Sequence, residues 1–222
     1  MNPLYMVLLY TVIFSNITHN KLGEFSYSIF VAAGSLTWGL FTDILNRSQN
    51  VFLTFANIIK KLRFPHGCLS VIVVANAWIS FIIAFGLFTG YLIISGNFPG
   101  WCYLAFIPIL MIQTLFAVGL GSTLGIFNIF FRDIGQAVVV LLQIWFWVTP
   151  IVYVQETLPL NIQHLLAFNP LTPIIHTYQT ILVRQQWPQW DDLIYPMIIA
   201  ILCCFFCYKL HQKLLIEILD EL

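Results

Sequence analysis

Long apolar runs separated by short polar segments form the main pattern of this chain. A transmembrane helix needs about 20 mostly apolar residues, and five of the runs approach or exceed that length. An earlier run is shorter: about fifteen residues rising about 1.5 Å each reach about 22 Å, less than a hydrocarbon core of about 30 Å. The pattern predicts six transmembrane helices, the first incomplete or strongly mismatched as written, at residues 3–17, 25–41, 69–95, 102–130, 137–154 and 193–208.

Residues 51–62 follow the amphipathic pattern of a helix that lies on a membrane surface. Pro65 and Gly67 end the pattern. We interpret the segment as an interfacial helix on the cytoplasmic side, which either anchors the chain to the membrane surface or transmits the movement of a partner into the neighbouring spans. Its apolar face holds Val51, Phe52, Phe55, Ile58, Ile59 and Leu62, and Asn50, Thr54, Asn57, Lys60 and Lys61 lie mostly opposite.

The loop at residues 155–192 is too apolar to be a simple solvated connection. It contains two apolar runs, residues 160–168 and 171–183, separated by Asn169-Pro170. Runs of this length cannot cross a bilayer, so they lie in the interface or re-enter between helices. The predicted fold is an all-α integral membrane protein of one domain, residues 1–222, with six transmembrane helices, a cytoplasmic amphipathic helix and two short external re-entrant or interfacial helices.

Basic residues predict the orientation of these helices. Loops on the cytoplasmic side of a membrane carry an excess of Lys and Arg. Both chain ends are therefore expected to be cytoplasmic, because this choice puts seven basic residues inside (Arg47, Lys60, Lys61, Arg63, Arg132, Lys209, Lys213) and two outside (Lys21, Arg184).

Composition agrees with a membrane protein and narrows its function. The chain is 60% hydrophobic and 8% charged, with zero formal net charge and a mean hydropathy of +0.89, whereas soluble domains are about 25% charged. The six predicted spans contain no Asp, Glu, Lys or Arg. Carriers coupled to protons or sodium usually hold an ionisable residue in the membrane, so the sequence gives little support to a secondary transporter.

Catalytic and metal-binding patterns are also missing from the sequence. Histidines and carboxylates are scattered over loops on both sides, without H-E-x-x-H spacing, and His164 and His176 are interpreted as interfacial residues. Cys204 and Cys207 lie in an apolar run, where cysteine behaves as a small hydrophobe. There is no G-x-x-x-x-G-K-[ST] phosphate loop. We predict no catalytic, cofactor-binding or metal-binding residue, and energy must come from a partner or a gradient.

Aromatic residues, 16% of the chain, gather near the predicted membrane edges. They form either an interfacial belt or, in part, a path, because aromatic faces stack on the apolar faces of sugar rings. Trp145, Phe146 and Trp147 are consecutive, so they cannot all face one channel.

Two further features have open interpretations. The pairs Gly86/Gly90 and Gly121/Gly125 pack helices either within one subunit or between two. Arg132-Asp133 forms either a local salt bridge or cap, or a contact with a partner.

Several segments together resemble the membrane subunits of ABC-2 type ABC transporters, and within them the exporters of O-antigen, capsule and teichoic acid. The resemblance covers nearly the whole chain and depends on the order and spacing of its segments. These are TVIFSNI at residues 11–17, GSLTWGLFTDILNRSQNVF at 34–52, KKLRFP at 60–65, NIFFRDIGQ at 128–136, TPIVY at 149–153 and NPLTPII at 169–175.

The resemblance implies a homodimer of six-helix subunits paired with two copies of a separate ATPase, which binds ATP and Mg, so this chain has no cofactor of its own. It implies that residues 43–64 contact the ATPase, and that family members carry a cytoplasmic segment ahead of the first span, which suggests a truncated N-terminus here. The implied sites are a conduit (Trp38, Trp145, Trp147, Tyr153), a coupling region (Phe52, Phe55, Ile59, Lys60, Lys61, Arg132, Asp133) and an external gate (Asn169, Pro170, Pro173).

The expected function is therefore that of a multi-pass permease of the inner (cytoplasmic) membrane that exports a lipid-linked polysaccharide. The chain itself is not expected to be an enzyme, and no nucleic acid is expected among its partners. Two alternatives remain at this point: an ABC-2 exporter of a drug or small lipid, and a membrane-embedded glycosyltransferase or acyltransferase. The scattered acid and base residues count against the second.

Overall fold

The computed structural model describes residues 24–56 and 67–221, and every regular element in them is helical. Four helices are long and apolar enough to span a membrane: α2 (Glu24–Thr54), α4 (Gly67–Ile94), α5 (Phe106–Phe130) and α9 (Ile194–Glu221). A fifth, α6 (Asp133–Val148), is apolar but shorter. The all-helical fold with membrane-spanning helices agrees with the prediction. The predicted first span, residues 3–17, lies outside the described residues.

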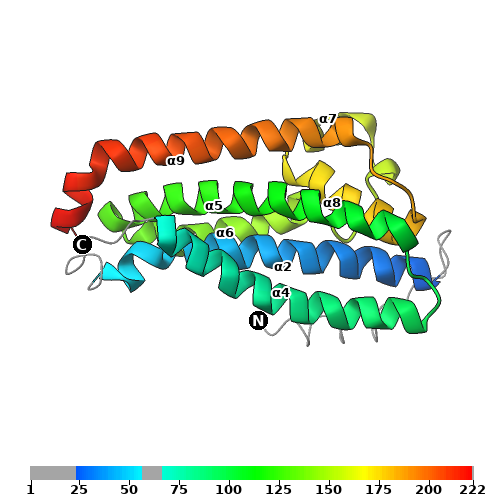
Figure 1. The fold of residues 1–222 in the computed structure, drawn as a ribbon. Coiled ribbons are helices and arrows are strands. Elements are labelled where there is room, and N and C mark those ends of the chain that lie inside the picture. The colour runs from blue at the N-terminus through cyan, green and yellow to red at the C-terminus, as the bar shows by residue number, and fades with distance from the viewer. Residues whose placement is uncertain (1–23, 57–66, 222) are drawn as a thin grey trace.

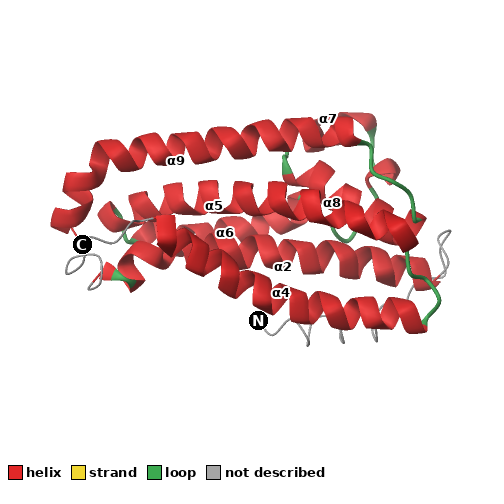
Figure 2. Ribbon diagram, in the orientation of Figure 1, coloured by secondary structure: helices red, strands yellow, loops and turns green. Residues whose placement is uncertain are grey.

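The helices lie side by side in an elongated bundle (Figure 1), joined by short loops (Figure 2). α5 packs extensively on both α2 and α9, and α4 packs on α2. The two short helices α7 (Leu160–Ala167) and α8 (Leu171–Gln179) gather at one end of the bundle, which we call the outer end; the other end is the inner end. The remaining turns of helix are η1 (Gly100–Ala105), η2 (Gln155–Thr157), η3 (Thr180–Arg184, π-helical) and η4 (Trp190–Leu193).

α2 differs most from its prediction. A span ending at Phe41 and a separate helix starting at Val51 were expected, but α2 continues unbroken to Thr54. No glycine or proline follows Gly39 in this helix, and the polar side chains bond locally: Arg47 Nε donates to Asp43 Oδ1 at 2.8 Å, and Asn50 Nδ2 donates to the carbonyl of Asn46 at 2.9 Å. The predicted boundaries are wrong, and residues 57–62 of the expected amphipathic helix lie outside the described residues.

Two other predicted spans have different ends in the structure. α6 stops at Val148 rather than 154, because Pro150 follows: the residue before a proline avoids the helical conformation, and Thr149 is extended with φ −92° and ψ 134°. α6 also begins at Asp133, so a turn of only two residues joins it to α5. α9 continues to Glu221 instead of ending near Tyr208, since its tail contains no glycine or proline.

Glycines of α5 let neighbouring helices approach closely. A Cβ atom added to Gly121 would lie 2.7 Å from Ser48 Cβ of α2, and one added to Gly125 would lie 2.9 Å from the Ser48 carbonyl oxygen. This pair therefore packs helices within the subunit, one of the two interpretations left open above. A Cβ added to Gly86 or Gly90 of α4 would meet nothing within 4 Å, so these glycines take no part in packing within the described bundle.

Candidate functional site

At the outer end, Asn169 joins the break after α6 to the start of α8. Its Oδ1 accepts hydrogen bonds from the indole N–H of Trp145 at 3.0 Å and from the backbone N–H of Leu171 at 3.1 Å. Its Nδ2 donates to Thr149 Oγ1 at 2.9 Å. All of the hydrogen bonds of this buried amide thus hold α6 and α8 in one arrangement.

Gln179 makes a similar connection at the other end of α8. Its Nε2 lies 3.3 Å from the Pro150 carbonyl oxygen, 3.2 Å from that of Ile151 and 3.5 Å from that of Phe30 in α2. The carbonyls of Pro150 and Ile151 lie after the end of α6, outside any helix, so Gln179 supplies a donor where the helical ladder does not. Gly34 of α2 leaves room for this amide, because a Cβ there would lie 3.0 Å from Gln179 Nε2.

The two short external helices differ in their surroundings. α8 is buried against α2 and α5, whereas α7 exposes Leu160, Leu165 and the following Phe168. Both short runs predicted from the sequence therefore form helices, and only the second lies within the bundle. Pro170 is the N-cap residue of α8 and Pro173 lies in its first turn. The gate function of Asn169, Pro170 and Pro173 stays a prediction.

The structure separates the four residues predicted to line a conduit. Trp38 is 8% exposed and meets Trp145 edge to face, with ring centroids 6.3 Å apart, inside the core of the subunit. Trp147 is 68% exposed and points away from that core. The Tyr153 hydroxyl donates to the carbonyls of Trp147 and Val148, and burial raises the pKa of this phenol, so it stays protonated. A lining function for these aromatics also stays a prediction.

Part of the predicted coupling region lies at the inner end. Phe52 is 5% exposed and packs in a cluster with Leu69 and Val73 of α4 and Ile126 and Ile129 of α5. Phe55 is half-buried against the same cluster. The remaining residues of this prediction are placed as follows: Arg132 and Asp133 are exposed at the α5–α6 turn, with Asp133 in the first turn of α6, and Ile59, Lys60 and Lys61 lie outside the described residues.

Asn128 organises the inner end and was missed by the sequence interpretation. Its Oδ1 accepts from the Gly135 backbone N–H at 3.0 Å, near the start of α6, and its Nδ2 lies 3.3 Å from the Gln49 carbonyl oxygen of α2. Its motif, NIFFRDIGQ at residues 128–136, was used only as evidence of resemblance to a transporter family. Nothing in its spacing could have shown that one side chain connects α2, α5 and α6.

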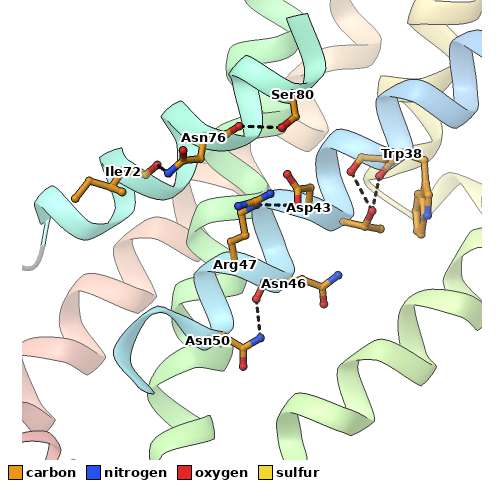
Figure 3. A network of polar contacts seen from close by, with 10 residues as sticks. Trp38, Asp43, Asn46, Arg47, Asn50, Ile72, Asn76 and Ser80 are labelled. Carbon is orange, nitrogen blue, oxygen red and sulfur yellow. Dashed lines mark hydrogen bonds and ion pairs between the residues drawn. The ribbon is translucent and has the colours of Figure 1, made fainter. Parts of the chain in front are cut away.

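A polar face on the inner half of α2 was also missed. Asp43, Asn46, Arg47 and Asn50 follow one side of the helix, beside Asn76 and Ser80 of α4 (Figure 3). An open groove of about 440 Å³ lies between the two helices. Because the candidate span continues to Thr54, this helix carries Asp43 and Arg47, which the predicted span ending at Phe41 did not include. The i, i+4 spacing of Asn46 and Asn50 in the sequence could have indicated that polar residues share one face of a helix.

The described part of the chain contains no group of three or more His, Cys, Asp or Glu residues that could hold a metal ion. Cys204 donates its thiol to the Leu115 carbonyl at 3.3 Å and packs against Gly119, as a small core residue does. At the outer end, Arg184 Nη2 lies 3.2 Å and His176 Nε2 lies 3.9 Å from Glu156 Oε1. All three side chains are exposed, and ion pairs in such positions contribute little stability.

Comparisons with known proteins give a consistent result. The model of the family "ABC-2 type transporter" matches residues 1–183. An O-antigen export system permease protein RfbA of Myxococcus xanthus is 27% identical over 195 residues, which are 87% of this chain and 74% of that protein. Two proteins of the same name from Klebsiella pneumoniae are 27% and 26% identical over 184 residues, which are 82% of this chain and 70% of each.

Proposed function

This chain belongs to the ABC-2 type transporter family, and we propose that it is the permease subunit of an ATP-driven exporter that moves a lipid-linked polysaccharide across the cytoplasmic membrane. The resemblance inferred from its motifs is confirmed at the level of the family. A member of this family is a transport subunit and not itself an enzyme. One observation carries the proposal: three relatives, each named as an O-antigen export permease, align with at least 82% of this chain.

The proposed assembly is a homodimer bound to two copies of a separate ATPase, which holds ATP and Mg. The missing phosphate loop of this chain supports a separate ATPase. The inner end offers residues for such a contact, because Phe55 is half-buried there and Arg132 and Asp133 are exposed.

The mechanism we propose is alternate opening of a conduit at the dimer axis, driven by the ATPase through residues 51–62. The continuity of α2 supports this mechanism. Its inner end packs on Leu69 and Val73 through Phe52, and its outer half meets α8, where Gln179 reaches the Phe30 carbonyl. A displacement at the inner end would therefore reach the proposed external gate through one helix.

Deletion of the gene in its native host tests the proposal. Loss of surface polysaccharide, with the completed glycan retained inside the cell on its lipid carrier and export restored by the intact gene, is the expected result. Purification of the tagged permease should also recover an ATPase subunit.

Two other outcomes would contradict polysaccharide export. Unchanged surface polysaccharide combined with greater drug sensitivity would indicate an exporter of drugs or small lipids. A glycan that is never completed, instead of being retained inside, would indicate a transferase.

A further inference from the structure

We propose that the polar face of α2, formed by Thr42, Asp43, Asn46, Arg47 and Asn50, is a binding surface for the sugar hydroxyl groups of the exported glycan. The surface continues across the groove to Asn76 of α4. The inference deepens the proposed polysaccharide export and rests on it.

This face lies at a depth where lipid could not solvate it. α4 has 28 residues, so it is about 42 Å long and, if centred, extends about 6 Å beyond each side of a hydrocarbon core of about 30 Å. Asn76 lies nine residues after Gly67, about 14 Å along the helix and hence about 8 Å inside the core. Polar side chains at that depth normally face protein or a water-filled cavity, and the groove provides such a cavity.

The dimensions of the groove suit a carbohydrate segment. Its volume of about 440 Å³ falls within the roughly 300–1,000 Å³ of ligand sites. It is open along one side and lined by both polar and apolar residues, including Phe55 and Ile72. An aromatic ring beside amide groups can contact the apolar face of a sugar ring while the amides bind its hydroxyl groups.

The charges on this face favour a neutral ligand. Arg47 Nε and Asp43 Oδ1 lie 2.8 Å apart and neutralise each other, so there is no unpaired charge on the face to select an ion. Asn50 and Asn76 each donate one amide hydrogen to their own helix, and the amide oxygens of Asn46 and Asn50 each accept one bond, from Gln49 and Asn128. An amide has two hydrogens and two acceptor lone pairs, so donors and acceptors remain side by side on this face. A sugar hydroxyl both donates and accepts, so this mixed surface matches it better than it matches phosphate, which only accepts when fully ionised.

The aromatic residues expected to line the path do not offer this surface within the subunit. Trp38 and Trp145 pack against each other in the core, and the Trp145 N–H is already bonded to Asn169. On α2, the exposed side chains are instead Arg47, Asn50 and Thr54, two of which belong to the polar face. The side chains of Arg47 and Asp43 are 45% and 35% exposed.

Thiol labelling tests whether the face is wet and whether glycan covers it. Asn46→Cys and Asn50→Cys variants are compared with Ala75→Cys and Ile82→Cys, exposed apolar positions on α4 that do not line the groove and lie on a different face of the helix from Asn76. The labelling of the native chain is subtracted from each. Inverted vesicles are treated with a membrane-impermeant thiol reagent, because the groove lies in the inner half. We expect labelling about tenfold faster at the two α2 positions than at the lipid-facing controls, since a thiol reacts as the thiolate, which requires water.

The second measurement repeats the labelling with glycan held in the transporter. Vesicles come from cells in which the partner ATPase is inactivated, with glycan synthesis either intact or blocked. Intact synthesis should slow labelling at Asn46→Cys and Asn50→Cys severalfold and leave the Ile82→Cys rate unchanged.

Two results would overturn the inference. Labelling as slow as at the α4 controls would mean that lipid or another protein segment covers the face. Fast labelling that does not respond to glycan would mean a wet surface that the glycan does not touch. Failure of the proposed function would be visible separately, because surface polysaccharide would then be unaffected by deletion of the gene, whatever the labelling shows.

Discussion

Single amides hold the outer end of this protein together. Asn169 uses both its donor and its acceptor on α6 and α8, and Gln179 bonds three carbonyl groups from α2 and the segment after α6. In an interior without water, an amide that loses its partners leaves their polar groups unsatisfied. Asn169 was predicted from its motif to be a gate residue, which stays a prediction, and its contacts show that it fixes the position of α8.

Asn169→Ala should destabilise the outer end by about 1–3 kcal/mol, because it leaves the Trp145 N–H buried without an acceptor. The measurement is the fraction of detergent-solubilised protein that remains monodisperse after heating. Asn161→Ala is the matched control, since Asn161 is an exposed amide on α7 and its loss should have little effect. Equal stability of the two variants would show that the Asn169 bonds do not hold α8.

Helix packing depends on which face of each element carries its small residues. Gly121 and Gly125 of α5 face Ser48 of α2, and Gly119 faces Cys204 of α9. The sequence shows the same four-residue spacing at Gly86/Gly90 and at Gly121/Gly125. Only the structure distinguishes the pair that packs inside the subunit from the pair that does not.

Gly121→Ala should destabilise the subunit by about 1–3 kcal/mol, because the added methyl group would lie 2.7 Å from Ser48 Cβ and 3.0 Å from the Leu45 carbonyl oxygen. Gly86→Ala makes the same chemical change in an open position and is expected to leave subunit stability unchanged. Thermal stability of the two purified variants, measured side by side, gives the comparison. A Gly121→Ala protein as stable as the parent would contradict the close α2–α5 contact.

At the scale of the whole molecule, the bundle places charged groups unequally at its two ends. Arg132 lies at the α5–α6 turn of the inner end, and Arg184 follows α8 at the outer end. The basic residues of the sequence predict that the inner end is cytoplasmic. The segments assigned to one side do gather at one end of the bundle, and which end is cytoplasmic stays a prediction.

The orientation predicts different accessibility of two exposed loop positions. Gln186→Cys, in the segment after η3, should react with an impermeant thiol reagent added to intact cells or spheroplasts, whereas Arg132→Cys should react only after the membrane is permeabilised. Both side chains are exposed, so folding is not expected to limit either reaction. The reverse pattern would invert the orientation and place the polar face of α2 in the outer half of the membrane.

Assembly with an ATPase should depend on the inner end. Phe55→Asp, alone or together with Ile59→Asp, should reduce co-purification of the ATPase by about tenfold or more, since a charge replaces an apolar contact in a region expected to be buried by the partner. Export should fall in parallel, and because Phe55 also lines the groove between α2 and α4, loss of export with the ATPase retained would count against coupling through Phe55. Phe168→Asp introduces the same charge at an exposed position of the outer end and should retain the ATPase. Normal association and export in the Phe55 variants would show that coupling occurs elsewhere.

Hydropathy and proline positions determined much of the architecture without any structure. Apolar length predicted the cores of α2, α4, α5 and α9, because a bilayer requires about 20 apolar residues per crossing, and Asn169-Pro170 predicted the division between α7 and α8. The predicted end of the second span was wrong because polar side chains there form hydrogen bonds within the helix instead of with water. The polar stretch after Phe41 was expected to leave the helix, yet the side chains of Asp43, Arg47 and Asn50 bond to one another or to their own helix.

Tertiary structure alone decided which side chains meet. Hydrogen-bond partners such as Gln179 and the Phe30 carbonyl lie 149 residues apart in the sequence, and periodicity carries no information about such pairs. The same holds for the burial of Trp38 against Trp145 and for the groove between α2 and α4, because both depend on the relative rotation of packed helices. The sequence thus determined the class of protein and its membrane segments, and packing decided which of their faces remain open to a substrate.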